Sequence, residues 1–217
     1  MSFAQARENP AALERYLDEQ RQRLGLDFLY HLTNAKSKAA AKRWPVIAAA
    51  AAGGSQTSID IFHAKDLKAR SATLAHQASL PLIATEAAVP TQRSTEDRGM
   101  VVHSATAIKT HRQSGVLVGG TLLNRNLNFI DTINALVYRA KGSDRQGTAT
   151  LFLEDVRIST NVRLFEDVRA LGTRVSAAVR SRVLDEGLTW LDRAFVVNDW
   201  YISGYQPITD SFGNRVG

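Results

Sequence analysis

The sequence has no cysteine, which excludes disulfide bonds, thiol nucleophiles, cysteine-ligated zinc and c-type haem attachment. Long apolar runs are absent too: the longest, Val46–Ala52, falls well short of the roughly 18 residues that cross a bilayer. The first residues, MSFAQARENP, are polar and lack the layout of a signal peptide. Hydrophobic residues still make up 44% of the 217 residues, enough to bury a core. We therefore expect a folded, soluble body.

A strong charge of one sign is also missing. Lysine and arginine number 27 against 21 aspartates and glutamates, a net charge of +6. The basic residues are spread along the chain, and the densest stretch is only Ala35–Trp44. Nucleic-acid binding needs such charge gathered on one face, so we expect no nucleic-acid partner. The mild positive field instead favours an anionic small ligand.

No catalytic or metal-binding pattern is found in the sequence. The five histidines do not have the spacing of a ligand pair, and no serine lies in a nucleophile elbow. Gly119-Gly120 lacks the lysine and the helix start of a phosphate-binding loop, and it predicts a bulge or a close backbone approach within a strand. We expect neither an enzyme nor a metal or cofactor site.

Before residue 141, periodicity predicts an N-terminal helix and then strands and helices. Asn9-Pro10 begins the first helix and Gly25 ends it, because Asn suits the N-cap and Pro the first turn. Pro45 begins or kinks a segment of the Ala-rich helix. The predicted helices are 10–24, 37–52, 64–78 and 126–138, the predicted strands are 26–32, 58–62, 100–108 and 115–123, and a polar, mobile loop is expected at 86–99.

The last third of the sequence begins with a linker at 141–147. Two strands, 148–153 and 156–162, flank a turn at Glu154-Asp155. A helix follows at 176–187, then a hairpin with its turn at Asn198-Asp199 and a last strand that begins at Val216. The sequence thus predicts an α+β protein with two related domains, each an antiparallel sheet with flanking helices.

Several motifs are similar, in order, to those of double-Cache sensor domains. GTATLFLEDVRISTNV, ALGTRVSAAV and RAFVVNDWYISGYQPITDSFGNRVG resemble the membrane-proximal half, and LGLDFLYHLT, RGMVVHSATAI and GVLVGGTLLNRN resemble the membrane-distal half. The resemblance runs from about Asn9 to Gly217 and is weakest over 34–55. It implies a long N-terminal helix (1–25) followed by two PAS-like Cache domains, a membrane-distal one at 26–140 and a membrane-proximal one at 147–217.

Such domains form the extracytoplasmic part of bacterial sensor histidine kinases and methyl-accepting chemotaxis receptors. The resemblance therefore implies a periplasmic sensor fragment of a membrane-anchored protein, and a homodimer formed through the N-terminal helix. It implies that the last strand is truncated and leaves an edge open to self-pairing. It leaves open whether the cytoplasmic output is a kinase, a chemotaxis signalling domain or a cyclase.

Two sets of side chains are candidates for binding a small ligand. The first set is Arg193, Trp200, Tyr201, Ser203 and Tyr205 on the closing hairpin. Alternation along the strand places Tyr201, Ser203 and Tyr205 on one face and Trp200 on the other. The tyrosines can donate hydrogen bonds to a carboxylate that Arg193 binds bidentately. In the alternative, the aromatic residues belong to the core and Arg193 to the surface.

The second set is Arg98, His103, Tyr30 and Trp44, in the predicted distal domain. Double-Cache domains usually bind their ligand in the distal half, which favours this set. Arg98 is placed where the polar loop enters a strand, a suitable position for a charged lid contact. In the alternative, as for the first set, these residues have only core or surface roles. The expected ligand is a small organic acid or amino acid. The main alternative is a protein-interaction module of the same fold with no small-molecule ligand.

Overall fold

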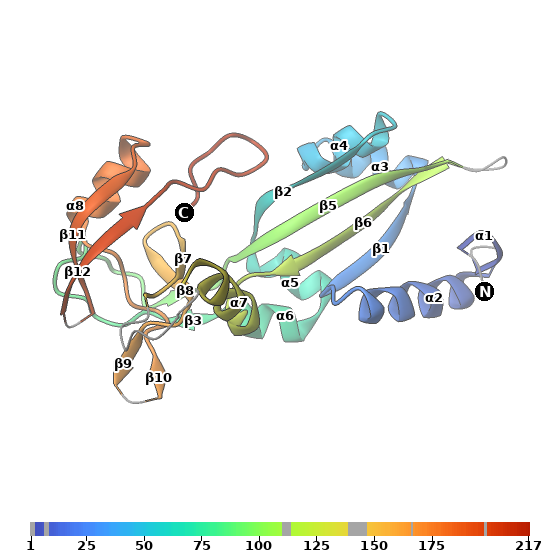
Figure 1. Ribbon diagram of the computed structural model, residues 1–217. Coiled ribbons are helices and arrows are strands. Elements are labelled where there is room, and N and C mark those ends of the chain that lie inside the picture. Colours follow the sequence, from blue (N-terminus) through green and yellow to red (C-terminus); the bar gives the residue numbers. More distant parts are fainter. Residues whose placement is uncertain (1–2, 7–8, 110–113, 139–146, 166, 198) are drawn as a thin grey trace. The chain divides into compact units, whose positions relative to one another are not determined.

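The computed structural model describes residues 3–6, 9–109, 114–138, 147–165, 167–197 and 199–217. The fold is α+β with antiparallel sheets, as predicted (Figure 1). Its contacts separate two units that interleave in sequence: Met1–Asp60 with Val101–Leu122, and Ile61–Met100 with Leu123–Gly217. The predicted linker lies outside the described residues except for Gly147, and the predicted domain boundaries stay a prediction. No helix in the described ranges has both the length and the apolar character to cross a bilayer.

The first unit contains a four-stranded sheet in the order β1-β6-β5-β2. Strands β1 and β5 both pair antiparallel with β6. The helices and strands that fall wholly or mostly in this unit are α1 (Phe3–Ala6), α2 (Pro10–Arg23), β1 (Phe28–Thr33), α3 (Asn34–Ala41), α4 (Pro45–Ala51), β2 (Ser55–Phe62), β5 (Gly99–Lys109) and β6 (Ser114–Leu122).

Local sequence signals explain the helix boundaries of this unit. The Asn9 side chain accepts hydrogen bonds from two backbone N–H groups of the first turn of α2 (3.0 and 3.4 Å), and Pro10 occupies the first helical position. Gly25 adopts a φ of +65° just after the helix. Pro45 begins α4, so the Ala-rich stretch forms two helices.

Asn9→Ala is expected to lower the free energy of unfolding by about 1 kcal/mol, because the first-turn N–H groups of α2 lose their acceptor. Asn9→Ser keeps a side-chain oxygen and should cost only about 0.3 kcal/mol. Urea unfolding followed by circular dichroism measures both variants. Equal losses in the two would show that the cap does not stabilise the helix.

Gly120 allows the Phe28 side chain to lie across β6. The two residues are partners in the β1–β6 register, and a Cβ atom at Gly120 would lie 2.5 Å from the Phe28 ring and 2.8 Å from the Val102 carbonyl oxygen. The pairs on both sides of β6 run through Gly119 and Gly120 without a register shift. The glycine pair therefore marks a close approach, and the alternative prediction of a bulge is wrong.

The second unit consists of short two-stranded sheets and helices. The strand pairs are β3–β4, β7–β8, β9–β10 and β11–β12, all antiparallel. Register shifts interrupt the ladders between Leu151 and Phe152 and between Val168 and Arg169. Such shifts locally disrupt the hydrogen bonding of a strand pair. In place of the single sheet predicted for the second half, the structure has separate two-stranded sheets.

The remaining helices and strands fall in the second unit. They are α5 (Ala64–Arg70), α6 (Ala72–Ala78), β3 (Leu80–Pro81), β4 (Thr95–Glu96), α7 (Leu127–Val137), β7 (Thr150–Leu153), β8 (Val156–Thr160), β9 (Arg163–Phe165), β10 (Val168–Arg169), α8 (Ala177–Arg180), the π-helix η1 (Ser181–Asp185), β11 (Trp190–Val196) and β12 (Asp199–Tyr205). Their core is a cluster of Phe152, Val162, Ala170, Val175, Val179, Val183, Ala194 and Val196.

Three predicted elements of the second unit differ in the structure. Helix 64–78 is interrupted at Ser71, whose extended backbone and capping side chain begin α6. Helix 176–187 forms α8 and then continues as η1. The loop 86–99 contains β4, and its Glu96 side chain is fully buried. Burial of that carboxylate requires partners distant in sequence, which local patterns do not reveal.

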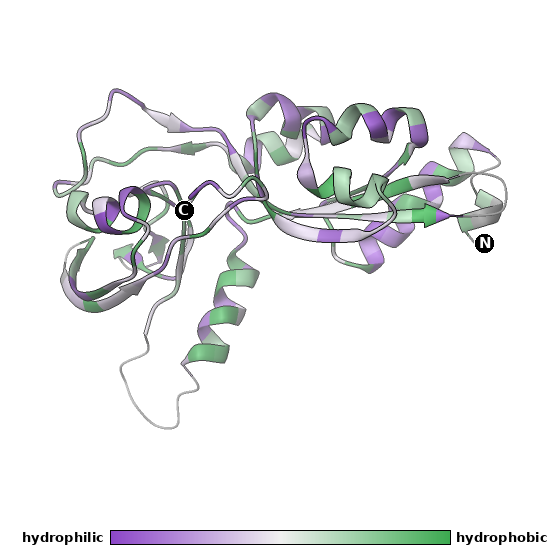
Figure 2. Ribbon diagram, turned by 90° about the horizontal axis from the view of Figure 1, so that it is seen from above, coloured by the Kyte–Doolittle hydropathy of each residue, from purple (hydrophilic) through white to green (hydrophobic). Residues whose placement is uncertain are grey.

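Helix α7 buries little of the apolar face predicted for it, and its ribbon in Figure 2 carries alternating hydrophobic and hydrophilic bands. Ile130 is buried, whereas Leu127 and Ile133 are half-buried. Leu136 and Val137 are exposed. The helical period is therefore correct, but the core covers only the first turns of the helix.

Val216 and Gly217 are hydrogen-bonded on both sides. The Val216 N–H donates to the Ile208 carbonyl (2.8 Å), and the Ile208 N–H donates to the Gly217 carbonyl (2.7 Å). On the other side, the Glu154 N–H donates to the Val216 carbonyl (2.7 Å). The open edge expected here is thus absent at these two residues.

Candidate functional site

Two adjoining cavities lie in the second unit. Both are lined by Thr150 and Phe152 of β7 and by Gly204 and Tyr205 of β12. The Phe152 and Tyr205 rings have centroids 5.9 Å apart. Strands β7 and β12 therefore supply a wall common to both cavities.

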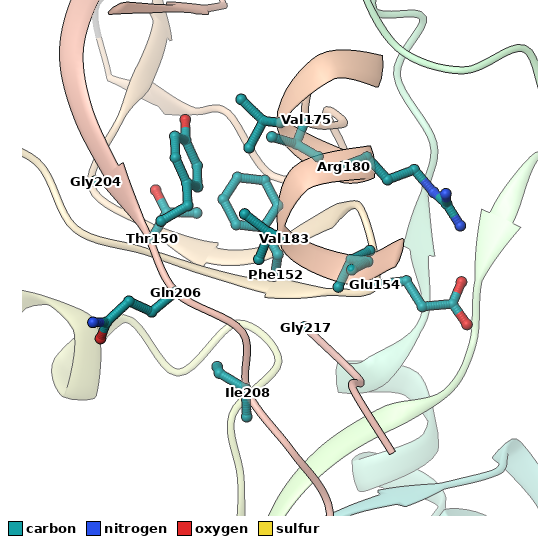
Figure 3. Close-up of a pocket in the computed structure, with 13 residues that line it drawn as sticks. Thr150, Phe152, Glu154, Val175, Arg180, Val183, Gly204, Gln206, Ile208 and Gly217 are labelled. Atoms are coloured by element: carbon teal, nitrogen blue, oxygen red, sulfur yellow. The ribbon is translucent and has the colours of Figure 1, made fainter. Parts of the chain in front are cut away.

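The first cavity, here called the helix-side cavity, has a volume of about 110 Å³ (Figure 3). Val175, Val179 and Val183 form its apolar wall on the side of α8 and η1. Glu154 and Arg180 contribute charged groups to its lining. An apolar hollow with few polar groups is the usual form of a small-molecule site.

The second cavity, here called the Arg157 cavity, has a volume of about 170 Å³. Its polar lining includes Arg157 of β8 together with Tyr201, Ser203 and Tyr205 of β12. Val162 and Val196 are among its apolar lining residues. This cavity therefore combines a cation, several hydroxyl groups and an apolar wall.

Arg157 is held by neutral groups and is only 3% exposed. Its Nε donates to Thr173 Oγ1 and its Nη1 to Thr150 Oγ1, both at 3.0 Å. The guanidinium carbon lies 4.9 Å from the centroid of the Phe152 ring, a cation–π contact. Burial lowers the pKa of Arg157 to about 10, so the group is still charged at neutral pH.

Tyr205 is a neutral hydrogen-bonding group at the same cavity. Burial raises the pKa of its phenol above the ordinary value of 10.0, while the charge of Arg157 and a hydrogen bond with Ser203 oppose that rise. At pH 7 the phenol is therefore protonated and able to donate to an acceptor in the cavity.

The strand pairing divides the predicted hairpin set between two faces. Tyr201, Ser203 and Tyr205 line the Arg157 cavity, sharing one face as alternation predicts. Arg193 pairs with Ile202 in the β11–β12 register, and its guanidinium carbon lies 5.7 Å from the Trp200 ring centroid. Arg193 therefore lies with Trp200 on the opposite face, and the structure does not bring it to the tyrosines.

Three residues of the second predicted set meet in the first unit. His103 is buried, with its Nδ1 2.7 Å from Asp60 Oδ2, and the Trp44 ring contacts it edge to face at 5.3 Å. Tyr30 joins this cluster through Phe28, whose ring lies 6.0 Å from Tyr30 and 6.3 Å from His103. This arrangement is a packed aromatic cluster around a buried His–Asp pair.

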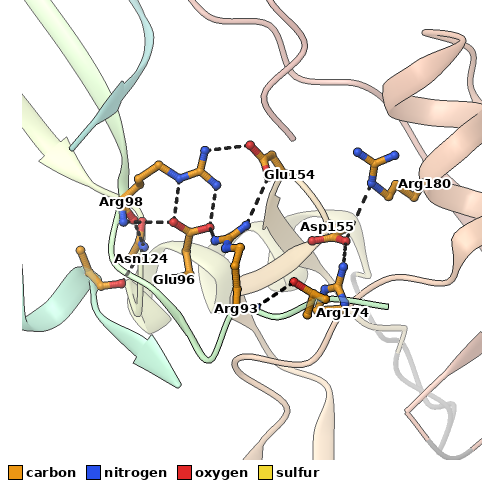
Figure 4. A network of polar contacts seen from close by, with 10 residues as sticks. Arg93, Glu96, Arg98, Asn124, Glu154, Asp155, Arg174 and Arg180 are labelled. Atoms are coloured by element: carbon orange, nitrogen blue, oxygen red, sulfur yellow. Dashed lines mark hydrogen bonds and ion pairs between the residues drawn. The ribbon is translucent and has the colours of Figure 1, made fainter. Parts of the chain in front are cut away.

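Arg98, the fourth residue of that set, belongs to the second unit and binds two carboxylates (Figure 4). Its Nε and Nη2 each donate to Glu96 at 2.8 Å, and its Nη1 donates to Glu154 at 2.7 Å. Arg93 pairs with the same two carboxylates. Arg98 also lines a cavity of about 480 Å³, but its donors are engaged by these ion pairs. Its contacts tie the residues before β5 to the β7–β8 turn.

These arginines keep both glutamates ionised. Burial alone would raise the pKa of Glu96, but the hydrogen bonds and charges of Arg98 and Arg93 outweigh it and hold the pKa below 4.5. The hydrogen bond from Arg98 likewise lowers the pKa of Glu154. The adjacent Asp155 pairs with Arg174 at 2.5 Å, which extends the charged network along the turn.

Sequence reasoning misses Arg157. It lies in β8 between the apolar residues Val156 and Ile158, a pattern typical of a strand with one solvated face. Every residue of β8 is nevertheless buried. The signal available in the sequence is the arginine as the second residue of a strand otherwise free of charge. Among the residues that the structure describes, no group of three or more His, Asp or Glu side chains is placed to hold a metal ion.

Comparison with known proteins gives one match. No curated protein and no solved structure matches the chain. Residues 121–217, which contain every lining residue of both cavities, match the family model of single Cache domain 3. A second Cache domain in the preceding residues stays a prediction. The C-terminal part of the chain is therefore similar to a Cache sensory domain.

Proposed function

We propose that the chain is the extracytoplasmic, ligand-sensing part of a bacterial transmembrane receptor. A small molecule binds in the cavities of the second unit and shifts an existing conformational equilibrium. In this proposal the sensing part lies in the periplasm, the protein is anchored in the inner membrane and forms a homodimer through α2, and the ligand is not chemically altered.

The observation that supports the proposal is the position of the two cavities within the Cache-like segment. Their common wall contains a phenyl ring, a phenol and a threonine hydroxyl, so both apolar and hydrogen-bonding contacts are available to one ligand. The ion pairs of Glu154 with Arg98 and Arg93 fix the turn that follows β7. A fixed wall of mixed polarity suits selective binding of a small molecule.

A thermal-shift screen against amino acids, organic acids, sugars and nucleosides tests the proposal. A ligand at a hundredfold excess over its Kd should add about 2.7 kcal/mol of stability. Val175→Phe, which fills the helix-side cavity, should reduce the shift for a ligand bound there, whereas Val168→Phe, at a residue that is 49% exposed and lines neither cavity, should not. Absence of a shift with every compound class would contradict ligand sensing.

A protein-interaction module is the second candidate function, and one surface favours it. On the face of β11–β12 that carries Arg193, Leu191 is 78% exposed, Ile202 79% and Trp200 59%. Exposed apolar patches of this kind commonly mark protein contacts. Under this alternative the face is covered by a partner protein.

Leu191→Asp, at a residue of this face that lines neither cavity, tests whether the face mediates association. If copies of the chain associate through this face, the variant should lower the mass measured by light scattering at high protein concentration. Association would bury the new carboxylate without a compensating positive charge, which is unfavourable. Leu188→Asp, at a residue that is 45% exposed and outside the hairpin, serves as the control. An unchanged mass in both variants would exclude self-association through this face.

A further inference from the structure

Arg157 is a buried cation for which the described residues supply no anion. The other well-shielded arginines of this unit pair with carboxylates, as Arg174 does with Asp155 and Arg98 with Glu96. Arg157 is more buried than either, yet the contacts found for it among the described residues are two threonine hydroxyls and a phenyl ring. A buried charge without a counter-ion is unfavourable, and an anionic ligand would relieve that cost.

Hydroxyl groups from β12 surround the same cavity. Ser203 and Tyr205 interact with each other, and the Tyr201 side chain is half-exposed at the cavity lining. Protonated phenols and a serine hydroxyl are suitable donors to the oxygens of an oxyanion. The charge of Arg157 and these donors therefore favour the same class of ligand.

The volume and the apolar walls of the Arg157 cavity limit which anionic ligands can bind there. About 170 Å³ is below the roughly 300–1,000 Å³ of sites for drug-sized ligands, so the ligand is compact. Val162 and Val196 offer hydrocarbon contacts in the lining of the same cavity. Phosphate and sulfate are polar on every side, whereas a short organic acid presents a charged end and an apolar body.

We infer that the Arg157 cavity binds the carboxylate of a short organic acid, with Arg157 as counter-ion and the Tyr205 and Ser203 hydroxyls as donors. The inference rests on the proposed sensing function and specifies the ligand class of that site. In this inference the buried Arg157 binds the acid, and not the exposed Arg193 that the sequence predicts for this role.

The experiment compares acetate, propionate and butyrate with the neutral amide of each acid and with inorganic phosphate. Binding to the complete chain is measured by calorimetry and by the shift in melting temperature. The carboxylates should bind at least tenfold more tightly than their amides, because only they neutralise the buried charge. Arg157→Met should abolish that preference. The matched control is Arg193→Met, which removes an arginine that also stacks on an aromatic ring but is exposed, and it should leave binding unchanged.

A second measurement keeps the test decisive if Arg157→Met fails to fold. In this proposal Tyr205 donates a hydrogen bond to the bound carboxylate, and a charged acceptor should shift the near-ultraviolet absorbance of its phenol at pH 7. Propionate should produce this change in the wild-type protein and propionamide should not. Tyr205→Phe assigns the signal, because the change should vanish in that variant.

Several results would overturn the inference. These are equal binding of acids and amides, undiminished acid binding by a folded Arg157→Met variant, binding of phosphate but of no carboxylate, and no effect of propionate on Tyr205. If these probes fail while a neutral compound from the wider screen binds, the sensing function stands and the ligand class is wrong. If no compound of any class binds, the sensing function fails as well.

Discussion

Gly172→Ala is expected to lower the free energy of unfolding by about 4 kcal/mol. Gly172 has a φ of +80°, a region that costs a residue with a Cβ atom about 1–2 kcal/mol. A Cβ atom built there would also lie 2.1 Å from the Pro81 carbonyl oxygen, so the backbone must move. Overpacking of this kind typically costs about 1–3 kcal/mol.

The strain at Gly172 would affect two segments at once. Its carbonyl accepts a hydrogen bond from Ile83 (2.9 Å), and its N–H donates to the Arg157 carbonyl (2.9 Å). Relief of the clash must therefore lengthen one of these bonds or displace β8. Urea unfolding gives the loss directly, and a thermal scan should show a decrease on the order of 10 °C.

Gly213→Ala is the matched control. Gly213 has a φ of +84°, but nothing lies within 4 Å of a Cβ atom built there. It should cost only the conformational part, about 1 kcal/mol. Similar losses in the two variants would show that the contact with Pro81 is unimportant and that backbone conformation alone explains the effect.

Glu96→Gln is expected to lower the free energy of unfolding by about 3 kcal/mol at pH 7. The Glu96 side chain is fully buried between Arg98 and Arg93, whose side chains are 23% and 41% exposed. Removing one partner of a buried ion pair typically costs about 3–5 kcal/mol. We expect the smallest loss in this range, because both arginines reach solvent and keep Glu154 as a partner. Glu86→Gln, at an exposed carboxylate, is the control and should change little.

The same variant should alter the dependence of stability on pH. The folded-state pKa of Glu96 lies below its ordinary value of 4.5, so its ion pairs contribute fully above about pH 4.5 and are lost as the pH falls through the lower, folded value. The wild-type protein should therefore lose stability steeply in this acidic range. Glu96→Gln should show a shallower decline, because one of the carboxylates with a lowered pKa is removed while Glu154 and Asp131 remain. Parallel curves would mean that folding does not lower the pKa of Glu96.

The sequence predicts the parts of this fold that depend on neighbouring residues. Asn9 and Pro10 mark the start of α2, Pro45 marks the start of α4, and the Glu154-Asp155 turn joins β7 to β8. In each case the signal is a side chain or a ring that acts on backbone within one turn of itself. Such effects are readable without knowledge of the rest of the chain.

The burial of Glu96 and Arg157 is not predictable in this way. Glu96 is buried through Arg98, which also reaches Glu154 56 residues further along, and Arg157 donates to Thr173 16 residues beyond it. Partners at that separation leave no periodic pattern. A single local prediction about either residue therefore assigns it to the surface.

The position of Arg193 was predictable, but from the turn and not from strand alternation alone. Val196 pairs with Asp199, so the odd-numbered residues of β11 lie on the same face of the hairpin as the even-numbered residues of β12. Any two-residue turn in this hairpin gives the same parity, which places Arg193 with Trp200. Alternation shows which residues of one strand share a face. The register across the hairpin then shows which residues of the other strand lie on that same face.

The hydrogen bonds at Val216 have a mechanical consequence for the cavities. Phe152 and Glu154 line the helix-side cavity, and the Glu154 N–H holds the Val216 carbonyl, while the Phe152 carbonyl is packed so closely against Gly217 that a Cβ atom there would lie 2.0 Å from it (Figure 3). No side chain intervenes that could absorb a displacement by changing rotamer. The backbone of β7 and its turn is thus in direct contact with residues 216–217, so a displacement of this backbone would also displace the C-terminal residues.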